Sequence, residues 1–226
     1  MDKYDKIIFD FDDTIWSRDP NDIDCSIYNV KFIKEHLSDK AIIVSGNSFV
    51  SIKEKLDAVD LTLPEVWADA NSILYEHGLF STVLSGCDIT SSALKFNEAI
   101  KNTSILKGRI LTFTGTEDII TNIKLKPFGL DRDIYLKQIN DLLKDLKLTD
   151  CIAKATGKTT IDIVSIYNSK ILVYNFLELD KYKTLYIGDE VDKGNDKDIA
   201  NLCTRKIRVN DVYDTKALLD CFGDSV

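Results

Sequence analysis

Short, largely apolar runs that end in polar or acidic residues recur near both ends of the chain. Three of them extend from Ile7 to Phe9, from Ala41 to Val44 and from Thr184 to Ile187. Runs of this length without alternation are typical of parallel strands that are buried on both faces. Stretches with helical spacing follow two of these runs, one from about Asp24 to Leu37 and one from Ser48 onward. Alternating strands and helices predict an α/β fold built on a doubly wound, Rossmann-like parallel sheet.

The same alternation continues to the end of the chain. After the third run we expect a loop, a helix through Ile199 to Leu202, a short strand in RKIRV and a last helix around Ala217 to Cys221. These elements would complete the sheet that the first two strands begin.

The middle of the chain has a different order of elements. It contains ILTFT, then a strongly helical segment from Leu136 to Leu148, then CIAKAT and TIDIVSI. Strands placed around a helix in this way predict an inserted α+β domain with its own sheet. We therefore expect a core formed by residues 1–80 and 166–226 and an inserted domain at residues 81–165, although no Gly/Ser-rich linker marks the borders.

Composition and charge narrow the classes of function. The 226 residues have a formal net charge of -8, which disfavours binding to nucleic acid or to an anionic membrane surface. The five cysteines form no C-x-x-C pair, as expected for reduced thiols of a cytoplasmic protein. The first residues, MDKYDKIIFDFDD, carry acids within their apolar stretch and do not resemble a signal peptide, and no later run is long enough to cross a bilayer. The sequence gives no signal for an oligomeric state.

The segment Asp10-Phe11-Asp12-Asp13-Thr14 directly follows the first predicted strand. Three carboxylates at a strand end repel one another and lose hydration unless a cation lies among them. Mg²⁺ prefers oxygen ligands of this kind. Asp10 and Asp12 would point to the same side of an extended segment, so one could attack a phosphorus atom while the other handles the proton of the leaving group. A solvated acidic turn is the alternative interpretation.

Ser45, Gly46 and Asn47 follow the second predicted strand and precede a predicted helix. A hydroxyl group and exposed amides at a helix N-terminus can bind a phosphate. The same residues are also common in an ordinary turn that caps a helix.

A second acidic segment follows the strand that ends at Ile187. Asp189 could complete a metal site with Asp10. Asn195 and Asp196 could orient the metal ligands by contacting them without binding the metal themselves. A charged surface loop is the alternative here. The three segments carry more weight together, because each follows a different buried strand at the end where open α/β sheets bind ligands.

These motifs resemble those of the haloacid dehalogenase-like phosphotransferase superfamily. IIFDFDDTI is similar to its first motif, D-x-D-x-T, VSGN to its second and IGDEVDKGNDKDIA to its fourth. SGNSFVSIKEKL and WADANSILYEHG resemble the branch with a type-two (IIB) α/β cap, which contains phosphomannomutase and sugar-phosphate phosphatases. Asp13 departs from the pattern, because many members have glycine at this position.

The resemblance implies a role for each matched residue. Asp10 would be the nucleophile that forms an aspartyl-phosphate, and Asp12 would be the acid/base. Mg²⁺ would be held by Asp10, by Asp12 through its backbone carbonyl, and by Asp189. Lys170, before a predicted helix, is the best match to the lysine of the third motif, and it would bind the transferring phosphoryl group with Ser45. Lys154 and Lys158 compete for this role, and a solvated lysine at a helix start is the plain alternative.

We therefore expect a magnesium-dependent phosphatase of a small phosphorylated metabolite, a sugar phosphate above all. A phosphohexomutase similar to phosphomannomutase is the first alternative, and a non-catalytic phospho-ligand-binding module is the second. A mutase needs a second phosphate site in its cap, which favours arginine. Arg109 and Arg132 are the arginines of this region, and Arg132 is a possible match. So few arginines favour the hydrolase, and the complete set of motif residues argues against the binding module.

Overall fold

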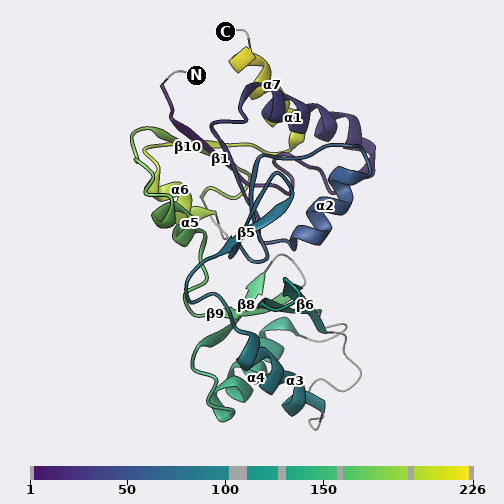
Figure 1. Ribbon diagram of the computed structural model, residues 1–226, viewed down its shortest axis with the longest axis vertical. Coiled ribbons are helices and arrows are strands. Elements are labelled where there is room, and N and C mark those ends of the chain that lie inside the picture. Colours follow the sequence, from purple (N-terminus) through teal and green to yellow (C-terminus); the bar gives the residue numbers. More distant parts are fainter. Residues whose placement is uncertain (1–2, 102–110, 127–130, 157–159, 193–195, 224–226) are drawn as a thin grey trace. The chain divides into compact units, whose positions relative to one another are not determined.

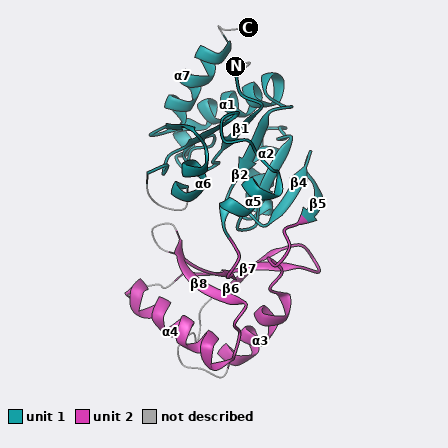
Figure 2. Ribbon diagram, turned by 90° about the vertical axis from the view of Figure 1, so that its left-hand side faces the viewer, with its two compact units in different colours: residues 1–82, 169–226 teal, residues 83–168 magenta. Residues whose placement is uncertain are grey.

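The computed structural model describes residues 3–101, 111–126, 131–156, 160–192 and 196–223. The chain forms two compact units, shown in Figure 2. The larger unit contains residues 1–82 and 169–226, and the smaller one contains residues 83–168. The borders expected from the sequence, after residues 80 and 165, therefore precede the observed borders, after residues 82 and 168, by two and three residues.

The larger unit is built on a seven-stranded sheet with the strand order β11-β10-β1-β2-β3-β4-β5. The strands are β1 (Lys6–Phe9), β2 (Ala41–Val44), β3 (Glu65–Ala68), β4 (Ile73–Glu76), β5 (Leu79–Val83), β10 (Thr184–Gly188) and β11 (Arg205–Arg208). β1 pairs in parallel with β2 on one side and with β10 on the other, whereas β3 and β4 are antiparallel. The carboxyl end of β1 is therefore a topological switch point, where doubly wound sheets bind their ligands.

Helices cover this sheet, as Figure 1 shows. They are α1 (Ile23–His36), α2 (Phe49–Asp57), α5 (Lys170–Phe176), α6 (Lys197–Leu202) and α7 (Val212–Gly223), with a short 3-10 helix at Pro20–Asp22. α1 packs against α7, and α5 packs against α6. The residues of β2 and β10 are all buried, as expected for strands covered on both faces. The predicted doubly wound α/β core is confirmed.

The smaller unit has its own antiparallel sheet, in the order β6-β7-β9-β8. Its elements are α3 (Thr90–Lys101), β6 (Leu111–Gly115), β7 (Ile120–Leu125), α4 (Arg132–Asp145), β8 (Cys151–Thr156) and β9 (Thr160–Ser165). Phe96 of α3, Ile139 of α4 and Ile123 of β7 belong to one buried apolar cluster. Both helices therefore pack on one face of this sheet, and the predicted α+β insertion is confirmed. Across the parts of the chain that the structure describes, no helix combines the length and apolar character needed to cross a membrane.

The turn between β3 and β4 could not be predicted from the sequence. Asp69, Ala70 and Asn71 all adopt left-handed conformations, with φ of 52°, 62° and 63°, although none of them is glycine. Asp69 is buried and accepts a hydrogen bond of 2.8 Å from the Tyr75 hydroxyl group. Its amide donates to the carbonyl of Asn47 at 2.7 Å. The turn thereby supports the loop that follows β2.

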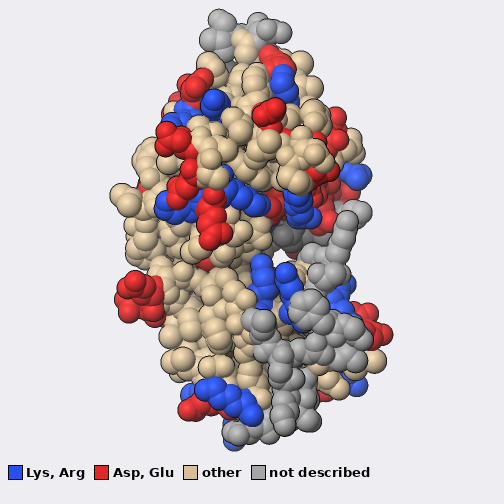
Figure 3. All heavy atoms as spheres, turned by 90° about the vertical axis from the view of Figure 1, so that its right-hand side faces the viewer, with Lys and Arg blue, Asp and Glu red and all other residues tan. Residues whose placement is uncertain are grey.

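Charged side chains of both signs are interspersed on the face of the molecule shown in Figure 3. Acidic residues outnumber basic ones, 37 against 29, over the whole chain. The predictions that the protein does not bind nucleic acid or membranes, and that it is cytoplasmic, stay predictions.

Candidate active site

Lys170 connects two carboxylates at the carboxyl end of the central strands. The amide of Asp10 continues the sheet by donating to the carbonyl of Ile187 at 3.0 Å. Lys170 begins α5, and its Nζ lies 2.6 Å from an oxygen of Asp10 and 2.6 Å from an oxygen of Asp196. The side chains of Lys170 and Asp196 are each only 1% exposed, and that of Asp10 is 13% exposed. A buried lysine thus links residues that lie far apart in the sequence.

The two competing lysines are placed differently. Lys154 lies on β8 of the smaller unit, and its Nζ donates to the carbonyl of Asn168 at 2.9 Å. Lys158 lies outside the described residues. Of the two candidate lysines that the structure describes, Lys170 contacts Asp10 and Lys154 has a different partner.

Asp10, Asp189 and Asp196 form a group of carboxylates suited to a metal ion. One oxygen from each of them lies within 4.8 Å of the others. The second oxygen of Asp196 is buried and has no hydrogen-bond partner within the described part of the chain. A Cβ atom at Gly188 would come within 2.7 Å of that oxygen, so glycine is needed for this close approach. These oxygen donors fit Mg²⁺.

The electrostatics of this group also favour a cation. Burial raises the pKa of Asp10 to about 8, although Lys170 acts to lower it. Burial, together with the charges of Asp196 and Glu190, raises the pKa of Asp189 to about 6. Burial acts to lower the pKa of Lys170. The nearby charge of Asp10, with smaller effects of Tyr186 and Asp196, outweighs burial and raises this pKa well above its ordinary value. A divalent ion among the carboxylates would stabilise their ionised forms.

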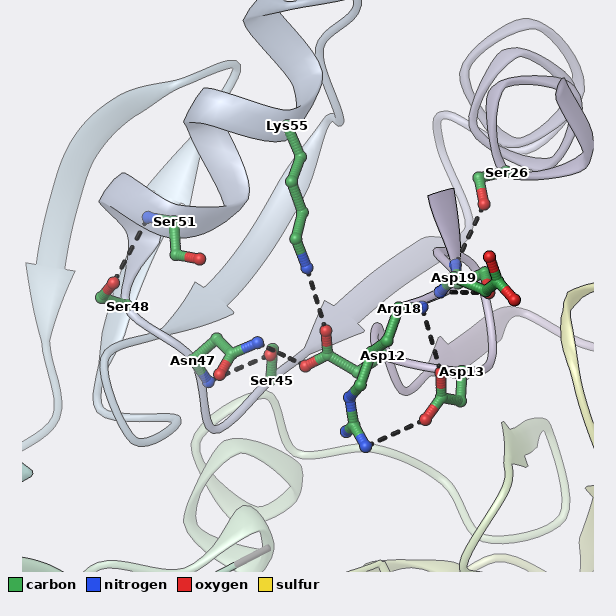
Figure 4. Close-up of polar contacts among 11 residues, drawn as sticks. Asp12, Asp13, Arg18, Asp19, Ser26, Ser45, Asn47, Ser48, Ser51 and Lys55 are labelled. Atoms are coloured by element: carbon green, nitrogen blue, oxygen red, sulfur yellow. Dashed lines mark hydrogen bonds and ion pairs between the residues drawn. The ribbon is translucent and has the colours of Figure 1, made fainter. Parts of the chain in front are cut away.

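The carboxylate of Asp12 has different partners, which Figure 4 shows. One oxygen accepts a hydrogen bond from the side-chain amide of Asn47, and the other lies 3.1 Å from Nζ of Lys55. The carboxylate therefore lies outside the group around Asp189 in the described residues. The role of Asp12 as a metal ligand through its backbone carbonyl stays a prediction.

Asp13 occupies the turn that follows Asp12 and is left-handed, with φ of 55°. Glycine adopts this conformation most readily, and aspartate is one of the other residues that tolerate it. Asp13 also pairs with Arg18 at 2.9 Å, as Figure 4 shows.

The segment Ser45-Gly46-Asn47 lies next to Asp12, as its position after β2 predicted. Ser45 is buried, its amide donates to the carbonyl of Trp67 at 2.8 Å, and its hydroxyl group accepts from the amide of Asn47 at 3.1 Å. Gly46 is half-buried. Asn47 connects this loop to Asp12. Binding of a phosphate by the loop stays a prediction.

The roles of two further residues that were assigned from the sequence stay predictions. Asn195 lies outside the described residues, so its role stays a prediction. Arg132 is half-buried and begins α4 in the smaller unit, where Asp131 caps the helix. Its role in binding a second phosphate also stays a prediction.

Sequence reasoning missed Lys55 and Asp69. Lys55 lies on α2, two residues after Lys53, and nothing in the local sequence distinguishes the two lysines. Asp69 is one of many acidic residues in the chain, and only the folded structure shows that it is buried and bonded to Tyr75.

Comparison by sequence identifies no relative, because no family model and no curated protein matches the chain. Comparison by structure finds proteins of similar fold. Trehalose-6-phosphate phosphatase of Aspergillus fumigatus matches with a TM-score of 0.59 and 14% identity, over 100% of this chain and 95% of that one. Sucrose-phosphatase of Synechocystis, in complex with sucrose and phosphate, matches with a TM-score of 0.56 and 17% identity, over 98% and 90% of the two chains. IMP-bound IMP-nucleotidase of Plasmodium falciparum matches with a TM-score of 0.57 and 15% identity, over 98% and 68%.

At identities this low, the likeness establishes the fold. The chain shares the fold of these three proteins, an α/β core with an inserted α+β unit, as the sequence predicted.

Proposed function

We propose that this chain is a magnesium-dependent phosphatase that acts on a small phosphorylated metabolite, with sugar phosphates as the first candidates. The main support is the buried contact of Lys170 with Asp10 and Asp196, beside Asp189. Burying these charges costs several kcal/mol of free energy per ion. The sum over the group is about as large as the free energy of unfolding of a whole domain. Such a cost is typical of functional sites, where charges are held ready for chemistry.

The structural neighbours support the choice of substrate class. By name, two of the three act on a sugar phosphate and one is a nucleotidase. All three names describe the removal of a phosphate from a small molecule. Sugar phosphates are therefore the first substrates to test, and nucleoside monophosphates are the second.

In the proposed mechanism, each residue has a step in phosphate transfer. An oxygen of Asp10 attacks phosphorus, the bond from phosphorus to the leaving oxygen breaks, and Asp12 donates the proton that this oxygen needs. Asp12 then takes a proton from water, which attacks the aspartyl-phosphate and releases phosphate. Lys170 and Ser45 hold the phosphoryl oxygens in place. Bound Mg²⁺, held by Asp10, Asp189 and the backbone of Asp12, would neutralise the charge on those oxygens.

Phosphate release from p-nitrophenyl phosphate, with and without Mg²⁺, tests this proposal. With phenyl phosphate, whose leaving group needs the proton, Asp12→Asn should lower the rate by roughly a hundred- to ten-thousand-fold, the usual range for a positioned acid/base. Asp57→Asn is a matched control, because Asp57 is an exposed carboxylate on α2 that pairs with Lys53. A wild-type protein without activity would instead favour the non-catalytic binding module. A panel of sugar phosphates and nucleoside monophosphates would then identify the substrate.

The mutase alternative needs a separate assay. The enzyme is incubated with hexose 1-phosphates, with and without catalytic hexose 1,6-bisphosphate, and both free phosphate and hexose 6-phosphate are followed. We expect phosphate release to dominate. Bisphosphate-dependent formation of the 6-phosphate, faster than phosphate release, would show a mutase. Arg132→Ala would then test whether Arg132 binds the second phosphate.

A further inference from the structure

Lys55 contacts the acid/base residue from a helix that belongs to a different part of the sequence. Its Nζ lies 3.1 Å from one oxygen of Asp12, while Asn47 donates to the other oxygen. The two side chains are 28% and 12% exposed, so water screens this ion pair only in part. The ammonium group also lies 5.2 Å from the ring centroid of Phe11, which is fully buried. Figure 4 shows Asp12 held between Lys55 and Asn47.

The contact differs from that of an ordinary lysine on a helix surface. Lys53 on the same helix pairs with Asp57 one turn away, and both of those side chains are at least half exposed. Residues two positions apart point to nearly opposite sides of an α-helix. Lys53 therefore forms a local surface pair, whereas Lys55 reaches a residue 43 positions away in the sequence. Lys55 lies in the last turn of α2, where a cation is favoured, but an exposed side chain would satisfy that preference equally well, so it does not explain the contact with Asp12.

We propose that Lys55 is a positioning residue for the acid/base carboxylate of Asp12; this inference rests on the proposed phosphatase function. A carboxyl group that is held at both oxygens cannot rotate freely, so the proton that it carries stays directed toward one place. When the bond from phosphorus to the leaving oxygen breaks, the proton of Asp12 moves to that oxygen. The negative charge then left on Asp12 forms beside the ammonium group of Lys55, which stabilises it.

This role makes a specific prediction about leaving groups. A poor leaving group needs the proton from Asp12, whereas a good one, such as p-nitrophenolate, departs almost without it. The measured quantity is kcat/KM for a series of aryl phosphates of graded leaving-group acidity, from p-nitrophenyl phosphate to phenyl phosphate. This ratio reports the path from free enzyme to the first chemical transition state, so hydrolysis of the aspartyl-phosphate does not contribute.

We expect Lys55→Met and Lys55→Gln to steepen the dependence of kcat/KM on leaving-group pKa. The value for phenyl phosphate should fall about ten- to a hundredfold, and that for p-nitrophenyl phosphate by less than about threefold. Lys55→Arg keeps the charge and should restore much of the wild-type slope. Lys53→Met, on the same helix, should leave the slope unchanged.

A double mutant separates positioning from a general structural effect. Asp12→Asn cannot transfer the proton, so Lys55→Met added to it should steepen the slope no further. If the wild type is active and Lys55→Met has the same slope as the wild type, only the role of Lys55 is overturned. Additional steepening by Lys55→Met in the Asp12→Asn background would overturn the same role. Failure of the wild-type protein to release phosphate from every aryl ester would overturn the proposed function, and this inference with it.

Discussion

Replacing Lys170 with methionine tests the centre of the candidate active site. Methionine is similar in length but carries no charge, so it leaves the carboxylates of Asp10 and Asp196 buried without their cation. Removal of one partner from a buried ion pair typically costs about 3–5 kcal/mol. For a chain of this size, each kcal/mol lowers Tm by roughly 2–4 °C, so we expect a loss of about 6–20 °C.

The assay is thermal unfolding followed by circular dichroism, with phosphate release measured on the same samples. Lys53→Met is the matched control, because the exposed pair of Lys53 with Asp57 should contribute less than about 1 kcal/mol. Lys170→Met should also lose at least about a thousandfold in activity, since positioning and charge stabilisation supply most of the catalysis in phosphoryl transfer.

A combined variant isolates the electrostatic origin of the loss. Lys170→Met together with Asp10→Asn and Asp196→Asn removes the cation and both of its carboxylate partners. Because replacing a whole buried charge group is often nearly neutral, this variant should recover most of the lost Tm while staying inactive. The reasoning is wrong if Lys170→Met unfolds at the same temperature as Lys53→Met, or if the combined variant is less stable than Lys170→Met alone.

Three further experiments test the site and the core. Asp10→Asn should abolish turnover and leave the fold intact, because an amide is nearly isosteric with a carboxylate but cannot attack phosphorus; activity above about a tenth of wild type would contradict the nucleophile assignment. Asp189→Ala should raise the Mg²⁺ concentration required for half-maximal activity, and full activity after exhaustive chelation would refute the metal site. Native protein should show one thiol that reacts quickly with a disulfide reagent, at exposed Cys221, because the other four cysteines are buried and burial raises the pKa of Cys151 and of Cys203 to about 12. Rapid reaction of more than one thiol would show that the core opens.

The strands and motifs near Asp10, Ser45 and Asp189 could be predicted because their signals are local. A short apolar run predicts a buried strand, and a polar group directly after it lies at the carboxyl end of that strand. Parallel pairing of β1 with β2 and β10 then brings these ends together. The order of the motifs along the chain was therefore enough to predict a site at this edge of the sheet.

Elements without such a local signal were missed. The strands β3, β4, β5 and β7 and the helix α3 were not predicted from the sequence, and α7 begins at Val212, ahead of the predicted start around Ala217. The turn that joins β3 to β4 has three left-handed residues and no glycine, so it lacks the residue that most strongly marks such a conformation. Its conformation is supported by distant contacts, such as the hydrogen bond from the amide of Asp69 to Asn47.

By itself, the sequence determined the class of fold and the candidate nucleophile, because hydrophobic periodicity and a motif of adjacent residues can be recognised without knowing how the elements pack. Only the tertiary structure decided which charges meet: Lys170 with Asp10 and Asp196, and Lys55 with Asp12. Helical spacing shows which face of α2 a lysine occupies, but it does not show what that face meets. The partner of a charged side chain depends on how helices pack on the sheet, which the local sequence does not specify.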